Sequence, residues 1–533
     1  MKISRRKLLE IASTLPVATA VGCADGLAPG DAEVQDDAAP DPEVDASPED
    51  LDGAIEIEPE DGSVGDDGGD ASVDASFDGG ERDAGPIDSG AISDARVTDT
   101  RPSDTGVAPS SLDFTRLPER TAQFPYAVMA GDATDTSVMF WTKFTGTGPL
   151  TLRVLEMNGT TITAVRYNGV VTPGAGGFVR VIVNGLRPNR RHRYAFLMGT
   201  PASPTGRSAI GVVKTAFAAD TLAPITFGGT SCSHPNARPH PVLQHAGSRT
   251  DLDFFIHLGD HIYADAGDNA VTLAEYRDKY ELSWPTTGMK ALHKSTGTYL
   301  TWDDHEVLNN WDPETISAAR LTNARNAFFE HRATRRNATS PNRLWRSFRW
   351  GRTAEIFILD CRSERRPSTR STSASRASQY LSRAQMDWLK NGLRTSPCVF
   401  KFIMNSVPIV DRAGSDGDNW NGYVSQRNEI LNHIANNDLR GVLWLSGDVH
   451  FGGVCRVEAS GPWSNIWEVV MGPSGSSRDS NPVLNTAQWP VRVLDNIKNY
   501  VVIRANPSTR VVDVEFINAA GDRVPGSRWT RTL

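Results

Sequence analysis

The chain has 533 residues, of which 39% are hydrophobic, and its formal net charge is −9. This length exceeds that of one ordinary domain, and five sparsely spaced cysteines do not form the pattern of a disulfide-rich scaffold. Residues 24–110 carry 26 acidic and 3 basic groups, and residues 1–23 carry four basic groups and one acidic group. Residues 111–533 are therefore left with a net charge of +11, which favours anionic substrates.

Residues 1–23 have the pattern of an export signal. Arg5 and Arg6 lie in a basic segment, and a short, mildly apolar stretch leads to Cys23. This pattern predicts a secretory signal rather than a membrane span, and the paired arginines favour the twin-arginine route. Residues 20–23, Ala-Val-Gly-Cys, resemble a bacterial lipobox, so we expect a membrane-anchored lipoprotein that faces the periplasm or the cell surface. Ordinary cleavage near Ala20 is the alternative, and it would give a periplasmic or secreted protein.

Residues 24–110 consist mainly of Asp, Ala, Gly, Pro and Ser. Such a composition cannot bury enough apolar surface to offset the entropy lost on ordering. We therefore predict a disordered acidic linker. Asp-rich runs also occur in calcium-binding repeats, but this segment has no fixed period.

Residues 111–220 are predicted to form a small all-β domain of the fibronectin or immunoglobulin kind. Short β-prone runs alternate with turns rich in Gly, Pro and Asn, at spacings typical of a sandwich. These runs are Ser137–Trp141, Leu150–Leu155, Phe178–Val183, Tyr194–Met198 and Ile210–Thr215. No cluster of catalytic residue types occurs here, so we expect a packing role, with sugar binding as the alternative.

Residues 221–533 are predicted to form a layered α/β domain. Near-continuous apolar strands such as Phe254–Leu258 and Val442–Leu445 alternate with helical segments. Two capping boxes predict helix starts at Thr272 and Ser382, with Glu275 and Gln385 three residues later. The second helix would turn a stripe toward the core, namely Met386, Trp388, Leu389 and Leu393.

Four of the predicted strands end in residues that bind metals. Ligands bind outside the carboxyl ends of strands in open α/β sheets, so these side chains should meet. Asp260 and Tyr263 follow one strand at D-x-x-Y spacing, where the carboxylate can bridge two cations and the tyrosine can bind Fe³⁺ as a phenolate. Cys232 follows another strand and is a second candidate ligand for iron, although it would also serve as a small buried hydrophobe.

Of the candidate segments, Asp303-Asp304-His305-Glu306 is the one least expected to have a purely structural role. Consecutive acidic and imidazole groups after a strand are costly unless they are paired or bind metal. We assign Asp304 as a metal ligand and His305 as a proton donor to the leaving group. Asn309 and Asn310 are candidate ligands of Ca²⁺ or of the substrate phosphate.

Two further strand ends complete the set. Asp448 and His450 lie two residues apart after one apolar strand, so both can reach one site. Arg362 follows another strand, where a guanidinium suits the binding of phosphate. Together these residues predict a two-metal hydrolytic site of the kind found in phosphatases and nucleases.

These motifs resemble those of the PhoD-like alkaline phosphatases, which are calcineurin-like metallophosphoesterases. The matching segments, in chain order, are 231–232, 259–263, 302–311, 359–363 and 446–450. Residues 130–142 likewise resemble the N-terminal β domain of that family. The resemblance implies an αββα sandwich, a centre of Fe³⁺ and Ca²⁺, and activity on phosphate monoesters or diesters.

The resemblance also implies individual roles. Iron would be held by Cys232, Asp260, Tyr263 and His450. Asp260, Asp304 and Asp448 would serve calcium, and His305 would lie near the substrate phosphate. The wider superfamily has a further histidine at a strand end that here reads Asn405-Ser406, so that ligand is expected to be absent or replaced.

The leading hypothesis is thus an exported, monomeric, metal-dependent phosphoesterase with no nucleic-acid partner. The alternatives are a phospholipase or a phosphodiesterase of cell-wall polymers, and a surface binding lipoprotein whose catalytic domain is degenerate. The intact ligand set argues against the latter. A serine hydrolase is disfavoured because no Gly-x-Ser-x-Gly elbow occurs.

Overall fold

The computed structural model describes residues 112–411, 417–477, 482 and 484–533. The predicted signal at 1–23 and the predicted linker at 24–110 lie outside the described residues. Among the helices that are described, none combines the length and the apolar character needed to cross a bilayer.

Two large sheets form the body of the protein. The first has nine strands, which are, in order across it, β21 (Trp529–Thr532), β20 (Val511–Asn518), β19 (Asn499–Asn506), β9 (Ile225–Thr230), β10 (Phe254–His257), β11 (Thr298–Leu300), β1 (Met129–Gly131), β2 (Ser137–Lys143) and β5 (Phe178–Asn184). The run from β9 to β1 is parallel, and the strands outside it pair antiparallel.

The second sheet has seven strands. They are, in order, β12 (Arg346–Trp350), β13 (Ala354–Ile358), β14 (Phe400–Met404), β15 (Val442–Ser446), β17 (Trp467–Val470), β16 (Gly452–Arg456) and β18 (Val491–Val493). The central run from β13 to β17 is parallel. Parallel strands of this kind are buried on both faces, which explains their near-continuous apolar sequences.

The main core lies between the two sheets. Side chains alternate between the faces of a strand, so Phe254 and Ile256 of β10 join this core while Phe255 points to the outer face. On β14 the same alternation sends Phe402 inward and Ile403 outward. Each sheet therefore needs a second apolar layer on its outer face.

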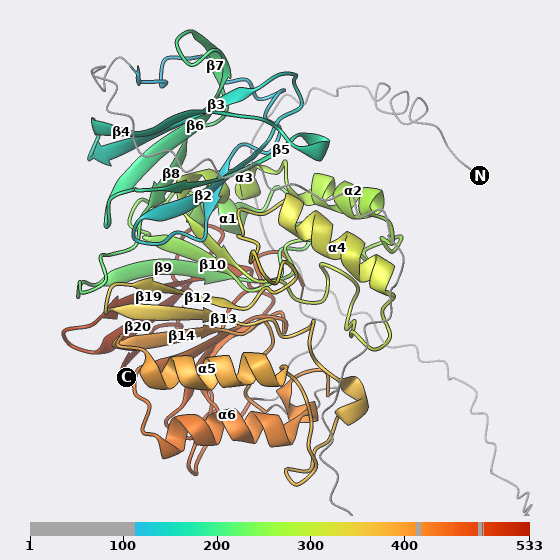
Figure 1. Ribbon diagram of the computed structural model, residues 1–533. Coiled ribbons are helices and arrows are strands. Elements are labelled where there is room, and N and C mark those ends of the chain that lie inside the picture. The colour runs from blue at the N-terminus through green and yellow to red at the C-terminus, as the bar shows by residue number, and fades with distance from the viewer. Residues whose placement is uncertain (1–111, 412–416, 478–481, 483) are drawn as a thin grey trace, which may run out of the picture. The chain divides into compact units, whose positions relative to one another are not determined.

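Helices supply these outer layers (Figure 1). The helices are α1 (Pro241–Ala246), α2 (Leu273–Ser283), α3 (Thr287–Ser295), α4 (Ala318–Glu330), α5 (Arg383–Thr395) and α6 (Val424–Asn436). α1 and α3 pack on the first sheet, and α5 and α6 pack on the second. The result is the αββα sandwich that the family resemblance implied. α2 and α4 instead pack beside the segments after β10 and β11.

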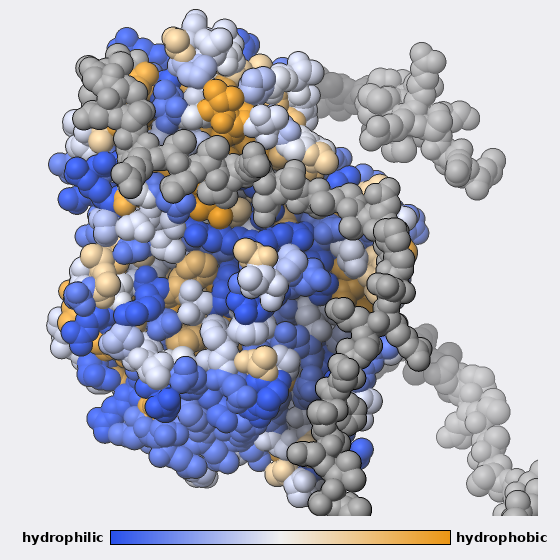
Figure 2. Space-filling view, viewed as in Figure 1, coloured by the Kyte–Doolittle hydropathy of each residue, from blue (hydrophilic) through white to orange (hydrophobic). Residues whose placement is uncertain are grey.

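Helix α5 shows how the sequence places these layers. Met386, Leu389 and Leu393 are buried against the second sheet, and Trp388 packs at the margin of the same cluster. The opposite face carries polar residues, and Figure 2 shows a broad hydrophilic surface over this part of the molecule. The predicted core-facing stripe is therefore confirmed.

One of the two predicted capping boxes forms completely. The Thr272 hydroxyl and the Glu275 carboxylate each accept from the backbone of the other residue at the start of α2. At α5 the Ser382 hydroxyl caps the helix, but Gln385 does not return to the cap. Its side chain instead accepts from the backbone N–H of Asp360, at 2.9 Å, because the end of β13 lies within reach.

The predicted all-β region contributes to two sheets. A third sheet consists of β4 (Thr161–Val171), β3 (Leu150–Asn158), β6 (Arg191–Gly199) and β7 (Pro204–Arg207), with β8 (Gly211–Lys214) also paired to β6. Its apolar face packs against β2 and β5, which makes a β sandwich. Because β1 pairs with β11, strands β1, β2 and β5 extend the first large sheet. The predicted boundary near residue 220 stays a prediction.

Candidate metal centre

The predicted ligands converge at one edge of the αββα sandwich. The segments after β9, β10 and β11 meet those after β13, β14 and β15 at the carboxyl ends of both parallel runs. Three overlapping groups of side chains there have one ligand atom from each member within 4.8 Å of the others. These groups are Cys232, Asp260 and His450; Asp260, Asp304 and His305; and Asp303, Asp304 and Asp448.

Tyr263 completes the first group. Its hydroxyl donates to Asp260 Oδ2 at 3.3 Å and lies 3.3 Å from His450 Nε2. It is also 2.5 Å from Ser476 Oγ. A thiol, a carboxylate, an imidazole and a phenol thus lie close together, and their assignment to iron stays a prediction.

The chemistry of this group fits a cation. Asp260 Oδ1 is buried and has no hydrogen-bond partner among the described residues. Burial raises the pKa of Asp260 well above its usual value, and burial together with the Asp260 charge does the same for the Cys232 thiol. A metal ion would offset both costs, because it favours the deprotonated form of each ligand.

The third group, Asp303, Asp304 and Asp448, has only oxygen donors, which suit a hard cation such as Ca²⁺. Asp304 Oδ1 and Oδ2 accept from the backbone N–H groups of His305 and Asn310, at 2.9 and 2.7 Å. Burial would raise the pKa of Asp304, but the charges of Arg362 and His305 hold it below its usual value. Asp304 is therefore a carboxylate that stays ionised.

His305 is oriented by a residue that the sequence analysis missed. Its Nδ1 lies 2.8 and 2.9 Å from the two carboxylate oxygens of Asp265, and its ring lies 4.1 Å from that of Tyr263, centroid to centroid. Burial would lower the pKa of His305, but Asp304, Asp260 and Asp265 raise it to about 10. The three carboxylates therefore favour the protonated form of the imidazole.

Arg362 lies beneath the centre and is fully buried. Its guanidinium binds Asp303 and Asp418, each at 2.5 Å. The Nη2 atom is 3.3 Å from Asp448 and 3.8 Å from Asp304. Arg362 thus offsets the negative charge of several buried carboxylates. The phosphate contact predicted for Arg362 stays a prediction.

Asn309 and Asn310 are exposed and lie at the rim of the centre. Their backbone N–H groups donate to Asp265 and Asp304, at 2.8 and 2.7 Å, which fixes the turn after His305. The predicted contacts of their side chains with Ca²⁺ or phosphate stay predictions.

Unusual backbone geometry holds the ligands in place. Cys232, Asp260, Asp448 and His450 all have positive φ values, between 51° and 69°. Such φ values are uncommon for residues other than glycine, and they persist where the surrounding structure offsets the strain. Glycine is required at position 259, just before Asp260. Its φ is 114°, and a Cβ there would lie 2.6 Å from the backbone nitrogen of Asp303. Only glycine lets these two segments approach so closely.

Four residues of the centre escaped prediction as functional residues: Asp265, Asp303, Glu306 and Ser476. Asp303 and Glu306 were noted within the Asp-Asp-His-Glu segment, but spacing alone did not assign them contacts. Asp265 lies two residues after Tyr263, in a segment whose path only the fold reveals. Ser476 comes from the segment after β17 and reaches Tyr263 across 213 positions of sequence.

The strand end that lacks the superfamily's histidine has a different role here. Asn405 Oδ1 accepts from Cys361 Sγ at 3.0 Å and from Trp420 Nε1 at 3.1 Å, and both contacts are buried. Ser406 Oγ donates to Asp303 Oδ1 at 3.1 Å. This segment therefore supports Asp303 through hydrogen bonds, and the three ligand groups contain no residue from it.

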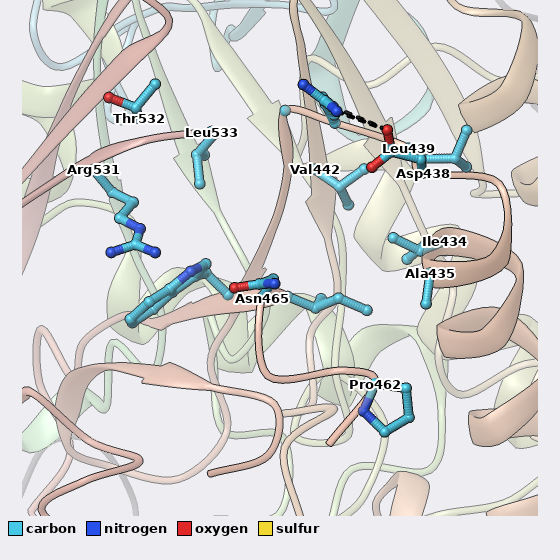
Figure 3. Close-up of a pocket in the computed structure, with 14 residues that line it drawn as sticks. Ile434, Ala435, Asp438, Leu439, Val442, Pro462, Asn465, Arg531, Thr532 and Leu533 are labelled. Carbon is cyan, nitrogen blue, oxygen red and sulfur yellow. Dashed lines mark hydrogen bonds and ion pairs between the residues drawn. The ribbon is translucent and has the colours of Figure 1, made fainter. Parts of the chain in front are cut away.

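A cavity of about 280 Å³ lies at the opposite ends of these strands (Figure 3). Val442, at the amino end of β15, lines it together with Ile434 of α6 and Arg531 of β21. None of the predicted site residues lines it. The cavity is therefore separate from the metal centre.

Comparison with known proteins shows the family of the chain. Residues 227–524 match the sequence model of the family described as PhoD-like phosphatase, and residues 107–215 match that of the PhoD-like phosphatase N-terminal domain. Alkaline phosphatase D of Bacillus subtilis (strain 168) is 27% identical over 384 residues, which cover 61% of this chain and 64% of that protein. The match thus spans less than two thirds of the length of this relative.

Solved structures share the fold. A structure of PhoD has a TM-score of 0.65 at 22% identity, covering 79% of this chain and 90% of its own. A purple acid phosphatase from yellow lupin (Lupinus luteus) seeds has a TM-score of 0.54 at 12% identity, covering 76% and 74%. Since the catalytic family model alone matches more than half of the chain, the protein belongs to the PhoD-like phosphatase family.

Proposed function

We propose that the protein is a metal-dependent phosphoric ester hydrolase. The observation that carries this proposal is the set of overlapping ligand groups, in which neighbouring groups share Asp260 or Asp304. Shared carboxylates can hold two cations close together, and paired cations are the typical device for in-line displacement at phosphorus. Family membership supports the same reaction class.

We assign Cys232, Asp260, Tyr263 and His450 to Fe³⁺, and Asp260, Asp304 and Asp448 to Ca²⁺. Soft and phenolic donors favour iron, and a set made only of carboxylates favours calcium. When bound, the cations supply Lewis acidity, which polarises the phosphoryl group and lowers the pKa of water. The basic residues 111–533, with a net charge of +11, attract the anionic ester.

His305 supplies the proton for the leaving group. Because Asp265 holds Nδ1, the imidazole presents its other nitrogen at a fixed angle, and the Asp265 carboxylate favours the protonated imidazole by raising its pKa. A proton donor held in this way assists departure of an alkoxide or phenoxide. Asp265 thus acts through His305, as a positioning residue.

The test is hydrolysis of p-nitrophenyl phosphate and of bis-p-nitrophenyl phosphate by the metal-loaded protein, with metal analysis of the same sample. Turnover of at least one ester that a chelator abolishes and iron with calcium restores is expected. Turnover of both substrates that survives complete metal removal would contradict the proposal. The ratio of the two rates decides between a monoesterase and a diesterase of lipids or wall polymers.

We also place the enzyme outside the cytoplasm, at a membrane. The support is the Arg5-Arg6 pair and the lipobox-like sequence that ends at Cys23. In a bacterial host, Cys23→Ala should move the protein from the membrane to the soluble exported fraction, and Arg5→Lys with Arg6→Lys should retain it in the cytoplasm. A membrane fraction unchanged by Cys23→Ala would exclude the lipid anchor.

A further inference from the structure

One buried carboxylate connects two of the metal-binding segments. Glu306 follows β11 and is fully buried. Its Oε2 accepts from the backbone N–H of Asp260, at 3.0 Å, and from that of Asp303, at 2.9 Å. A single oxygen atom therefore spans the segments after β10 and β11, which carry the two shared ligands.

The other oxygen of Glu306 is held by His261. Oε1 accepts from the His261 backbone N–H at 2.6 Å and lies 3.0 Å from His261 Nδ1. His261 is also fully buried, and its ring stacks on that of His257 with 3.7 Å between centroids. Ser233 Oγ, one residue beyond Cys232, lies 2.8 Å from His257 Nε2. The contacts thus extend from Glu306 to the segment after β9.

None of these contacts requires Glu306 to touch a metal ion, because both of its oxygens are already used. A carboxylate is the only common side chain that offers two oxygens, each with two lone pairs, to four N–H donors. Hydrogen bonds to charged groups are stronger than neutral ones, and leaving a buried donor unpaired is costly. The Glu306 carboxylate is therefore suited to hold the segments after β10 and β11 at a fixed distance from each other.

We propose that Glu306, held by His261, is a positioning residue that sets the spacing between Asp260 and Asp304 and thereby the affinity of the centre for metal. Asp260 has φ of 57°, a strained conformation that external contacts must hold. Glu306 Oε2 supplies such a contact directly at Asp260, because it accepts from the Asp260 backbone N–H. This inference rests on the proposed function.

The first test uses Glu306→Gln and Co²⁺ as the probe. The amide keeps the size of the side chain but turns one acceptor into a donor, which faces two N–H groups. We expect the Kd for Co²⁺ to rise by about 10–100-fold, as is usual for residues that orient metal ligands. The d–d absorption of bound Co²⁺, which reports coordination geometry, should also change.

Glu468→Gln is the matched control. Glu468 is equally buried, and it accepts from the backbone N–H groups of Ile409 and Val410, each at 2.9 Å, neither of which is a ligand. Both variants should lower the Tm of the metal-free protein. Only Glu306→Gln should also reduce the additional rise in Tm that Co²⁺ produces. An equal reduction in both variants would overturn the proposal, because it would indicate a general loss of packing.

His261 gives a second, milder pair of variants in case Glu306→Gln does not fold. His261→Asn keeps a donor near the position of Nδ1, whereas His261→Leu removes it. Weaker Co²⁺ binding in the leucine variant with recovery in the asparagine variant supports the proposal, and equal binding in both overturns it. A wild-type protein that binds no Co²⁺ would overturn the proposed function as well, whereas unchanged affinity in Glu306→Gln would overturn this inference alone.

Discussion

At the scale of residues, the centre depends on side chains whose neighbours alter their chemistry. Burial raises the pKa of Tyr263 well above that of a free phenol, as do the charges of Asp260 and Cys232. Its hydroxyl nevertheless lies between Asp260, His450 and Ser476. A buried phenol in such a place would ionise only beside a strong positive charge, which Fe³⁺ supplies.

The first prediction therefore concerns colour. The purified protein should contain iron and show a visible band from charge transfer between the Tyr263 phenolate and Fe³⁺. Tyr263→Phe should bleach or shift this band, measured by absorption spectroscopy at equal iron content. An active protein that is colourless and free of iron would show that Tyr263 is not a ligand.

The second prediction separates two adjacent residues. Asp304→Asn should lower the occupancy of the second metal, because a charged oxygen ligand is lost. His305→Ala should keep both metals but lower kcat by roughly 10²–10⁴-fold, the usual contribution of a positioned proton donor. Metal analysis and rates on a phenyl and an alkyl phosphate measure these effects.

The loss in His305→Ala should be smaller for the phenyl ester, whose leaving group is more acidic. His433→Ala, on α6, is the control and should change neither metal content nor rate. The roles are reversed if His305→Ala loses metal while Asp304→Asn retains it.

At the scale of elements, close approach between segments decides where helices can pack. α3 begins beside the segment that precedes α1, and a Cβ at Gly288 would lie 2.0 Å from the backbone oxygen of His240. At Gly174, by contrast, the nearest atom would be 3.5 Å from a Cβ, and the backbone is extended with φ of −81°. The two glycines therefore differ in the space around them.

We predict that Gly288→Ala destabilises the protein although alanine favours helix formation. Helix propensity alone would stabilise it by about 0.5–1 kcal/mol. The clash with a backbone atom should outweigh this gain, since overpacking costs about 1–3 kcal/mol. Chemical denaturation of Gly288→Ala and of Gly174→Ala measures the difference, and the control should stay within about 0.5 kcal/mol of wild type. A more stable Gly288→Ala would show that α3 moves freely away from α1.

At the scale of the whole molecule, charge is divided between two parts of the chain. The acidic residues 24–110 and the basic residues 111–533 have opposite net charges of −23 and +11. Within the part of the chain that the structure describes, the candidate ligands of the metal centre lie between Cys232 and His450, in the basic part. Catalysis should therefore depend on that part alone.

We predict that deletion of residues 24–110 leaves kcat/KM and Tm nearly unchanged. The composition of this segment predicts an unfolded spacer that contributes nothing to the folded core. Steady-state kinetics and thermal unfolding of the deleted and full-length proteins test this at matched ionic strength. A large fall in Tm on deletion would show that the acidic segment packs on the basic one.

The sequence predicted the apolar strands, the helix starts and the candidate ligands, and the family resemblance implied how the layers stack. Near-continuous apolar runs indicated which strands are buried on both faces, and local caps such as Thr272 indicated helix starts. The candidate ligands could be predicted because each follows an apolar strand, and the carboxyl ends of parallel strands share an edge. These features are local, so short windows of sequence carry them.

Only the tertiary structure decided which distant groups support the ligands. Gln385 has the spacing of a capping box, yet it binds Asp360 because β13 ends beside α5. Asp265, Glu306 and Ser476 contact His305, Asp260 and Tyr263 respectively, through hydrogen bonds that link different segments of the chain. Such contacts follow from how the sheets and segments pack, because a hydrogen bond depends on distance in space and leaves no spacing rule in the sequence.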